Sequence, residues 1–222
     1  GKPEVVYYNG WRGDEHIVSP KEKIEADEFT KFEGSNAKAL GIENMAEACV
    51  QGRGVLVDLE KRHGRDRVLV GYEELMRILE EDNIEIEQGD MACFHTGFAQ
   101  GLMDMNKNPN EHDLHNTFAC LDGRDEKLQD WIRDSGIAVI IADNYGIEDV
   151  SSPLPTGTNP IAMLPLHELC IFKLGIHIGE MFYLTPLRDW LRKNKRNRFL
   201  LTAPPLRLPG AVGSPPSPIA TV

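Results

Sequence analysis

Cysteine is scarce in this sequence, and its spacing excludes two classes of small protein. The cysteines at positions 49, 93, 120 and 170 include no Cys-x-x-Cys pair. A zinc ribbon requires such pairs and a disulfide scaffold requires a dense set of cysteines, so neither is expected. We interpret the four as buried thiols in a reducing compartment, which makes the cytoplasm the expected location.

Long apolar runs, a secretory leader and a surplus of basic charge are also missing. The longest apolar run, residues 137–142, is far shorter than the roughly 20 residues that span a bilayer, and residue 1 opens no signal-peptide pattern. The 24 Lys and Arg against 35 Asp and Glu give a formal net charge of −11, which repels phosphate backbones and anionic lipids. We expect a small-molecule substrate as partner, and neither nucleic acid nor membrane.

Three common catalytic and cofactor-binding motifs are absent. The sequence contains no phosphate-binding Gly-x-x-x-x-Gly-Lys-Ser/Thr, no Gly-x-Gly-x-x-Gly after a strand, and no Gly-x-Ser-x-Gly elbow. Nucleotide-binding and serine-hydrolase functions therefore lack their main sequence support.

The chain nevertheless has the composition of a globular protein with one substantial core. Its 222 residues are 41% hydrophobic and 27% charged, which are ordinary values for a soluble domain. From residue 53 onward, β-branched runs alternate with amphipathic stretches, a pattern typical of an α/β fold with a central sheet covered by helices. Strands are predicted at 54–59, 90–96, 137–143, 176–184 and 199–203. Helices are predicted at 42–50, 72–82, 125–135, 163–174 and 186–195.

Both ends of the sequence differ from this pattern. Residues 1–52 are polar and charged, and we expect them to form an N-terminal segment that wraps an α/β domain at 53–222. The last 20 residues contain six prolines, which excludes a helix or a central strand and predicts an extended tail at 203–222. We expect this tail to be ordered, because it carries apolar side chains that a free linker does not need, namely Leu206, Leu208, Ala211, Val212 and Ile219.

Glu180 and His167 are the most informative polar residues, because both fall in apolar patterns. Alternation along the strand predicted at 176–184 places Glu180 on an apolar face, and helical spacing does the same for His167. The simplest explanation of such a carboxylate is a structural ion pair. The simplest explanation of a lone histidine on an apolar face is a core residue whose hydrogen bonds are satisfied. Together they also fit a helix and the next strand that deliver one nitrogen and one oxygen to a shared cation.

His95, Asp143 and Asn144 are further candidates, as residues that line a pocket. They lie at the ends of two predicted strands, where polar residues of an α/β sheet often face the ligand crevice. A simple strand-terminating turn explains them equally well.

Five blocks of the sequence occur in the order found in a known family. They are GRGVLVDL from Gly52, QGDMACFHTGF from Gln88, IIADNYGIE from Ile140, LHELCIFKLGIHIGEMF from Leu166 and APPLRLPGAVGSPPSPIA from Ala203. Residues 52–222 thereby resemble the cyclase family of metal-dependent hydrolases, which contains kynurenine formamidases and isatin hydrolases. The most specific part is the histidine followed twelve residues later by Gly-Glu, together with the proline-rich tail.

The resemblance implies a swivelling β/β/α-type fold and a metal site. His167 and Glu180 match the histidine and glutamate that bind metal in the C-terminal half of family members. The other ligands come from an upstream motif, His-x-Gly-Thr-His-x-Asp, which this sequence lacks, and Tyr8-Asn9-Gly10 matches a segment shortly after that motif. We therefore expect the catalytic residues upstream of Gly1, and the sequence to be a fragment, a cleaved or partly ordered chain, or a member without its metal site.

For an intact member, the resemblance implies hydrolysis of an amide, formamide or cyclic amide with zinc or manganese, by a homodimer or higher homo-oligomer. Two other functions stay open: a metal-free binding or scaffold protein, and an unrelated α/β enzyme with Glu180 in a structural ion pair. If the metal site exists, His167 and Glu180 should converge within roughly 3 to 5 Å. We expect them to border a pocket near Tyr7–Gly10.

Overall fold

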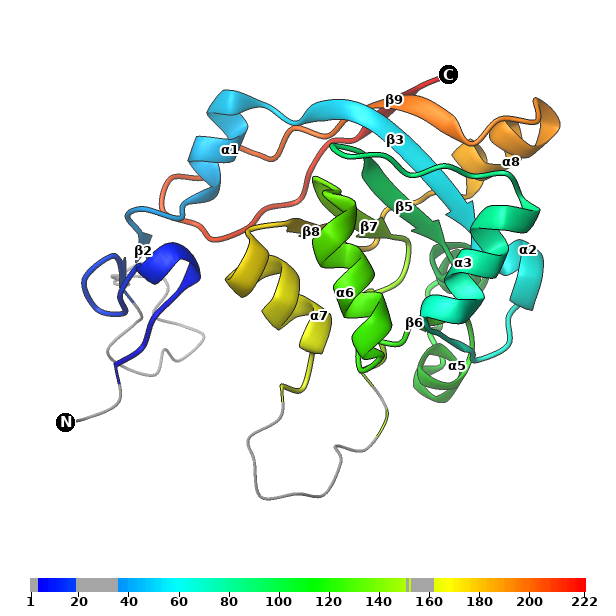
Figure 1. Cartoon of the computed structure of the whole chain (residues 1–222), viewed down its shortest axis with the longest axis horizontal. Coiled ribbons are helices and arrows are strands. Elements are labelled where there is room, and N and C mark those ends of the chain that lie inside the picture. The colour runs from blue at the N-terminus through cyan, green and yellow to red at the C-terminus, as the bar shows by residue number, and fades with distance from the viewer. Residues whose placement is uncertain (1–3, 19–35, 151, 153–161) are drawn as a thin grey trace. The chain divides into compact units, whose positions relative to one another are not determined.

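The computed structural model describes residues 4–18, 36–150, 152 and 162–222 (Figure 1). The chain divides into two compact units, one of residues 1–51 and 202–219 and the other of residues 52–201 and 220–222. This division groups the tail with the N-terminal segment, whereas the sequence suggested that it belongs to 53–222. Residues 1–3 and 19–35 of the predicted wrapping segment lie outside the described residues.

A six-stranded sheet forms the centre of the fold, in the order β10-β9-β3-β5-β7-β8. Its parallel strands are β3 (Gln51–Asp58), β5 (Met91–His95), β7 (Val139–Ala142) and β8 (His177–Gly179). The sheet is completed by β9 (Arg198–Thr202) and β10 (Ile219–Thr221). All residues of β5 and β7 are buried, as is usual for parallel strands covered on both faces. The predicted α/β fold with a central sheet is confirmed.

Two amphipathic helices, α3 (Tyr72–Glu81) and α6 (Glu126–Ser135), contribute to the same hydrophobic core as the sheet. Their first turns share one carboxylate. Asp125 Oδ1 accepts hydrogen bonds from the backbone N–H of Lys127 and Leu128 at 2.9 and 3.3 Å, and Asp125 Oδ2 accepts one from Tyr72 at 2.7 Å. Asp125 therefore satisfies backbone donors that would otherwise be orphaned at two helix starts.

Several short elements were not predicted from the sequence. They are α2 (Leu59–His63), α4 (Phe98–Asp104), α5 (Glu111–Asn116), β4 (Leu69–Val70) and β6 (Cys120–Leu121), of which the two strands pair with each other in parallel. Such elements are too short for an apolar periodicity to develop. A longer helix, α8 (Thr185–Lys193), lies where the sequence predicted one.

The region of His167 and Glu180 differs from its prediction. The helix expected from residue 163 begins at Pro165 as α7 (Pro165–His167) and continues as a π-helical segment, η3 (Glu168–Leu174). The strand expected at 176–184 is reduced to β8, because Met181 has a left-handed φ of 56° that a strand does not contain. Glu180 follows the strand instead of lying within it, so strand alternation was the wrong reason for its position.

The described part of the first unit contains four short N-terminal elements, and backbone hydrogen bonds join the tail to two of them, β2 (Asn36–Ala37) and α1 (Ile42–Ala48). The other two are η1 (Tyr8–Gly10) and β1 (Ile17–Val18). Ala37 N donates to Gly210 O at 2.8 Å, and Ile42 N donates to Ala211 O at 2.7 Å. These bonds fix the backbone of the tail, but the packing of its apolar side chains, on which the expectation of order rested, stays a prediction. Its larger apolar side chains are 40% to 70% exposed in the single chain, namely Leu206, Leu208, Val212 and Ile219.

The structure tests the prediction that the four cysteines are buried, and the described helices can be compared with the length of a membrane span. Cys93, Cys120 and Cys170 are buried, whereas Cys49 is exposed, so the prediction of buried thiols is wrong for Cys49. It occupies the C-terminal cap of α1, at the end of a helix that has no buried residue. Among the described residues, no helix combines the length and apolar character that crossing a membrane requires.

Candidate metal centre

Glu148 and the start of α7 form the base of the candidate centre. The Glu148 side chain is fully buried. Its Oε2 accepts a hydrogen bond from Leu166 N at 2.9 Å, and its Oε1 accepts one from His167 N at 3.0 Å. A buried carboxylate needs such donors, and free N–H groups of a first helical turn supply them.

The imidazole of His167 lies between two carboxylates. Its Nδ1 is 2.9 Å from Glu148 Oε1, and its Nε2 is 3.1 Å from Glu180 Oε1. Hydrogen bonds and charge from Glu148, followed by those from Glu180, raise the pKa of His167 to about 9. Because an ionised carboxylate only accepts hydrogen bonds, both ring nitrogens must act as donors when no cation is bound.

Glu180 is held in place by the chain that follows β8. Met181 N donates to Asn144 O at 3.0 Å, and Phe182 N donates to Ala142 O at 3.2 Å, which ties this segment to the end of β7. The Glu180 side chain is 33% exposed and that of His167 is 24% exposed. Within the described part of the chain, Glu180 has no Lys or Arg partner and pairs with His167 alone.

The geometry of these residues fits a cation. The predicted convergence of His167 and Glu180 within 3 to 5 Å is confirmed, because His167 Nε2 and Glu180 Oε1, the two atoms that could bind a metal, lie 3.1 Å apart. One imidazole nitrogen and one carboxylate oxygen are a donor set that suits zinc or manganese. The positions of Tyr7–Gly10 beside the centre, and of a pocket there, stay predictions.

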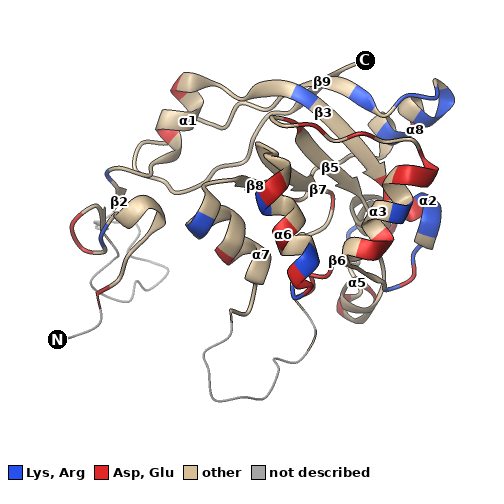
Figure 2. Cartoon of the chain, viewed as in Figure 1, with Lys and Arg blue, Asp and Glu red and all other residues tan. Residues whose placement is uncertain are grey.

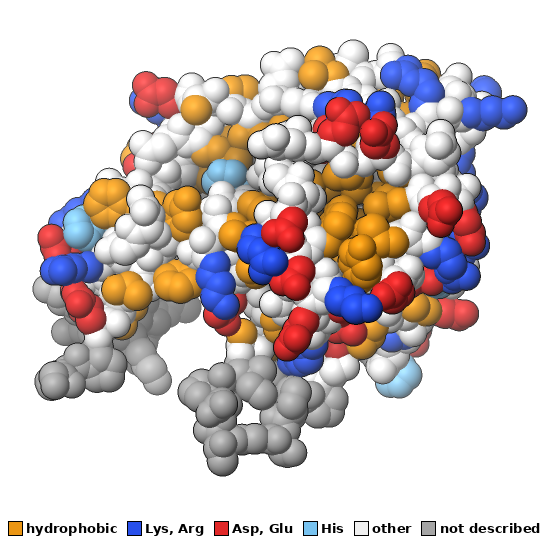
Figure 3. Space-filling model, viewed as in Figure 1, with side chains coloured by type: hydrophobic (Ala, Val, Ile, Leu, Met, Phe, Trp, Pro, Cys, Tyr) orange, Lys and Arg blue, Asp and Glu red, His pale blue; other side chains and the backbone are white. Residues whose placement is uncertain are grey.

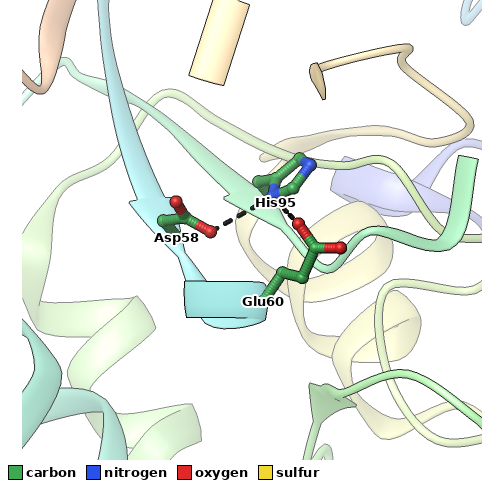
Figure 4. Close-up of side chains that lie close together, drawn as sticks. All are labelled: Asp58, Glu60 and His95. Carbon is green, nitrogen blue, oxygen red and sulfur yellow. Dashed lines mark hydrogen bonds and ion pairs between the residues drawn. The ribbon is translucent and has the colours of Figure 1, made fainter. Parts of the chain in front are cut away.

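A second group of potential metal ligands lies at the carboxyl ends of β3 and β5 (Figure 4). One ligand atom each from Asp58, Glu60 and His95 lies within 4.8 Å of the others. His95 Nδ1 is 3.2 Å from Asp58 Oδ1 and 3.9 Å from Glu60 Oε2. The parallel register places Asp58 directly beside His95, which explains why residues so distant in the sequence meet.

Two arginine side chains of α8 form ion pairs with the carboxylates of this second group. Arg192 Nε lies 2.6 Å from Asp58 Oδ2, and Arg188 pairs with Glu60. Lys and Arg side chains are abundant on α8 and in the turn after it (Figure 2). Burial by itself raises the pKa of Asp58, but the hydrogen bond and charge of His95 and the charge of Arg192 lower it overall. This group therefore fits a buried ion-pair network better than a cation site.

The three residues predicted to line a pocket are buried close to this network. His95 Nε2 lies 3.2 Å from Thr185 Oγ1 and 3.8 Å from Asp143 Oδ2. Asp143 accepts hydrogen bonds from Thr96 N, Thr96 Oγ1 and Gly97 N at 2.6, 2.7 and 2.9 Å, while burial raises its pKa. The Asn144 side-chain oxygen is buried and has no hydrogen-bond partner among the described residues.

A cavity of about 510 Å³ lies next to the network, between the end of β3 and α8. Asp58, Arg188 and Arg192 contribute to its lining, and His95, Asp143 and Asn144 do not. The three residues lie at the carboxyl ends of β5 and β7, and their part in lining a pocket or binding a substrate stays a prediction.

Sequence reasoning missed Glu148, Asp58 and Glu60 as members of these groups. Asp58 directly follows the buried apolar run 55–57 in the block GRGVLVDL, whereas Glu148 lies in the block IIADNYGIE, six residues after the end of β7. A carboxylate directly after such a run is the signal that could have identified Asp58, and Glu148 carries no such signal. Glu60 lies in the short helix α2 and carries no comparable signal.

Comparison with known proteins identifies the family of the chain. The family model named Cyclase matches residues 16–149, which is more than half of the sequence. The chain belongs to the cyclase family, as its sequence blocks indicated. No curated protein matches it.

Solved structures agree with this assignment. A crystal structure of a novel cyclase has a TM-score of 0.76 at 28% identity, covering 98% of this chain and 63% of that one. Isatin hydrolase A from Ralstonia solanacearum has a TM-score of 0.54 at 14% identity and covers 81% of this chain and 63% of its own. Isatin hydrolase A from Labrenzia aggregata, bound to benzyl benzoate, has a TM-score of 0.56 at 15% identity, with 82% and 65% covered. The two hydrolases show likeness of fold alone, and the chain spans 63% to 65% of the length of these proteins.

Proposed function

We propose that the protein is a metal-dependent hydrolase that acts on an amide, a formamide or a cyclic amide. The observation that carries this proposal is the 3.1 Å approach of His167 Nε2 and Glu180 Oε1. Membership of the cyclase family supports it, because proteins named isatin hydrolase share the fold.

His167 and Glu180 are the residues of this chain that we expect to contribute to the metal site. When bound, a divalent metal lowers the pKa of a water molecule and polarises a carbonyl oxygen. His167 and Glu180 would hold zinc or manganese through one nitrogen and one oxygen. Two side chains are fewer ligands than a complete site requires, so the proposal includes further ligands from other residues of the protein.

Metal titration and a hydrolysis assay test the proposal. We expect Glu180→Gln to weaken the binding of Zn²⁺ or Mn²⁺ by at least about tenfold in calorimetric titration, because it removes a charged ligand. The same variant should lose hydrolysis of isatin and of an aryl formamide. The matched control is Glu168→Gln, whose carboxylate pairs with Lys173 at 2.6 Å and not with His167. Equal metal affinity in the wild-type protein and Glu180→Gln would contradict the metal site.

A metal-free binding protein with the cyclase fold is the second candidate. One observation favours it, since both ring nitrogens of His167 already have carboxylate partners. The titration separates the two functions, because the second predicts no metal binding by the wild-type protein. An unrelated α/β enzyme is disfavoured by the family match and by the lack of a Lys or Arg partner for Glu180 among the described residues.

We propose in addition that the protein works in the cytoplasm as a homodimer or a higher homo-oligomer. The location rests on the spacing of the cysteines, which form no disulfide among the described residues.

A further inference from the structure

The backbone around Glu148 is fixed from both sides. A parallel bridge joins Glu148 to Leu121, with Leu121 N donating to Ile147 O at 3.0 Å and Asp149 N donating to Leu121 O at 3.1 Å. Ile147, which is buried, has a φ of 56°, and the turn is closed by a hydrogen bond from Glu148 N to Gly146 O. A β-branched residue adopts this conformation only where the surrounding structure imposes it, and such positions concentrate at functional sites.

Gly123 leaves the space that the Glu148 carboxylate fills. A Cβ atom added at Gly123 would overlap Glu148 Oε2 and would lie 2.9 Å from Glu148 Cδ. The φ of Gly123 lies outside the left-handed region, so the backbone conformation does not require glycine there. Close approach of the carboxylate is the remaining reason for a residue without a side chain.

The buried carboxylate meets three donors from one short segment. Leu166 N, His167 N and His167 Nδ1 all donate to Glu148, so its two oxygens contact both the backbone and the ring of His167. A histidine that donates from one nitrogen to a carboxylate presents its other nitrogen in a fixed direction. Here that nitrogen, Nε2, faces Glu180.

We propose that Glu148 is a positioning residue, seated against Gly123, that keeps His167 Nδ1 protonated and directs Nε2 to a cation shared with Glu180. The inference rests on the proposed metal site and adds to it a residue that does not touch the metal. Such carboxylates orient the histidine and increase its basicity as a ligand, and their loss costs about 10 to 100-fold in metal affinity.

The first test replaces Glu148 with glutamine in the full chain. If the amide nitrogen of Glu148→Gln takes the place of Oε1, it cannot accept from His167 Nδ1. If the amide oxygen takes that place, the bond to Nδ1 persists but a neutral acceptor makes it weaker than the carboxylate does. We expect Zn²⁺ affinity to fall about 10 to 100-fold. We also expect the ¹⁵N and ¹H signals of the His167 Nδ1–H group in the metal-free protein to shift toward those of a weaker hydrogen bond, with faster exchange with water. Glu168→Gln, the neighbouring change of equal charge, should alter neither.

The second test keeps Glu148 and adds a side chain at Gly123, in the space that the Glu148 carboxylate occupies. Gly123→Ala should displace the carboxylate and produce the same two changes, whereas Gly213→Ala, where an added Cβ meets no atom within 4 Å, should not. In a Glu148→Ala background, where only the 3.2 Å approach to the Cβ of residue 148 remains, Gly123→Ala should cause little further loss. Circular dichroism confirms that each variant is folded.

The outcomes separate this inference from the proposed function. Unchanged Nδ1 signals in folded Glu148→Gln and Gly123→Ala overturn the positioning by Glu148, whatever the metal does. If those signals change but the wild-type protein binds no metal, the positioning stands as a property of the ring and the proposed function fails. Wild-type metal affinity in both variants overturns the link between Glu148 and the metal.

Discussion

His167 makes the stability of the metal-free protein depend on pH. Glu148 and then Glu180 raise its pKa from 6.5 to about 9. A group whose pKa is higher in the folded state stabilises fully below its unfolded pKa and ceases to do so as the pH rises through the folded pKa. We therefore expect the free energy of unfolding to fall between pH 6.5 and about 9. After screening of the partly exposed ring, the fall should be about 2 kcal/mol.

Urea unfolding at about pH 6 and about pH 10, with a chelator present, measures this fall. His167→Gln removes the titrating ring and should flatten the profile over the same range. An equally steep profile in His167→Gln would assign the dependence to other groups.

Asp58 gives a second prediction at the scale of single residues. Its pKa is lowered, so its ion pairs stabilise the fold above the unfolded value of 3.8 and are lost as the pH falls through the folded value. Arg192→Leu should destabilise the protein by about 1 to 3 kcal/mol at neutral pH, since it leaves a buried carboxylate without one partner. The loss should shrink as Asp58 becomes protonated.

Chemical unfolding of Arg192→Leu at neutral and acid pH provides the measurement. Lys193→Leu is the matched control, because Lys193 is exposed on the same helix and has no ion pair among the described residues. An equal loss in both variants would indicate an effect of helix α8 and not of the Asp58 pair.

At the scale of elements, α3 and α6 depend on one shared cap. Asp125→Ala removes acceptors for Lys127 N and Leu128 N in α6 and for Tyr72 N in α3. We expect a loss of about 1 to 3 kcal/mol in the free energy of unfolding, which exceeds that of a single cap because two helices are affected. Thermal and urea unfolding should show it.

The control for this prediction is Asp130→Ala within α6, whose carboxylate pairs with Arg133 on the surface at 2.8 Å. Exposed pairs of this kind contribute about 0 to 1 kcal/mol, so this variant should remain close to the wild-type protein. If Asp125→Ala is equally harmless, the two helix starts do not depend on Asp125.

At the scale of the whole molecule, exposed hydrophobic side chains suggest association with further copies of the chain. Large apolar residues of η3 and of the segment after β8 are 41% to 51% exposed, namely Ile171, Phe172, Met181 and Tyr183. Hydrophobic side chains are also exposed on the face that carries α3 and α6 (Figure 3). Where such side chains form a contiguous patch, the patch is typical of an interaction site.

Light scattering tests the proposed homo-oligomer. The expected mass is a multiple of the 24.9 kDa of one chain, with the dimer as the smallest species. Phe172→Asp should shift the species toward monomer, whereas Met103→Asp, at an exposed position on α4, should not. A monomer alone at micromolar concentration would contradict the proposal.

The sequence by itself determined the elements whose apolar pattern is long enough to be regular. The buried strands β5 and β7 and the helices α3 and α6 were predicted within a few residues of their ends, because periodicity depends only on neighbours along the chain. The order of five sequence blocks likewise indicated the cyclase family and paired His167 with Glu180.

Only the tertiary structure decided which other polar residues lie beside His167 and Glu180, and which lie beside His95. Glu148 meets His167 because a bridge to Leu121 and a strained turn at Ile147 fix its backbone. Asp58 meets His95 because two parallel strands adopt one particular register. Register and close packing depend on contacts between distant segments, and no local pattern encodes them. For the same reason the sequence placed Glu180 near His167 correctly but assigned it to a strand that ends one residue earlier.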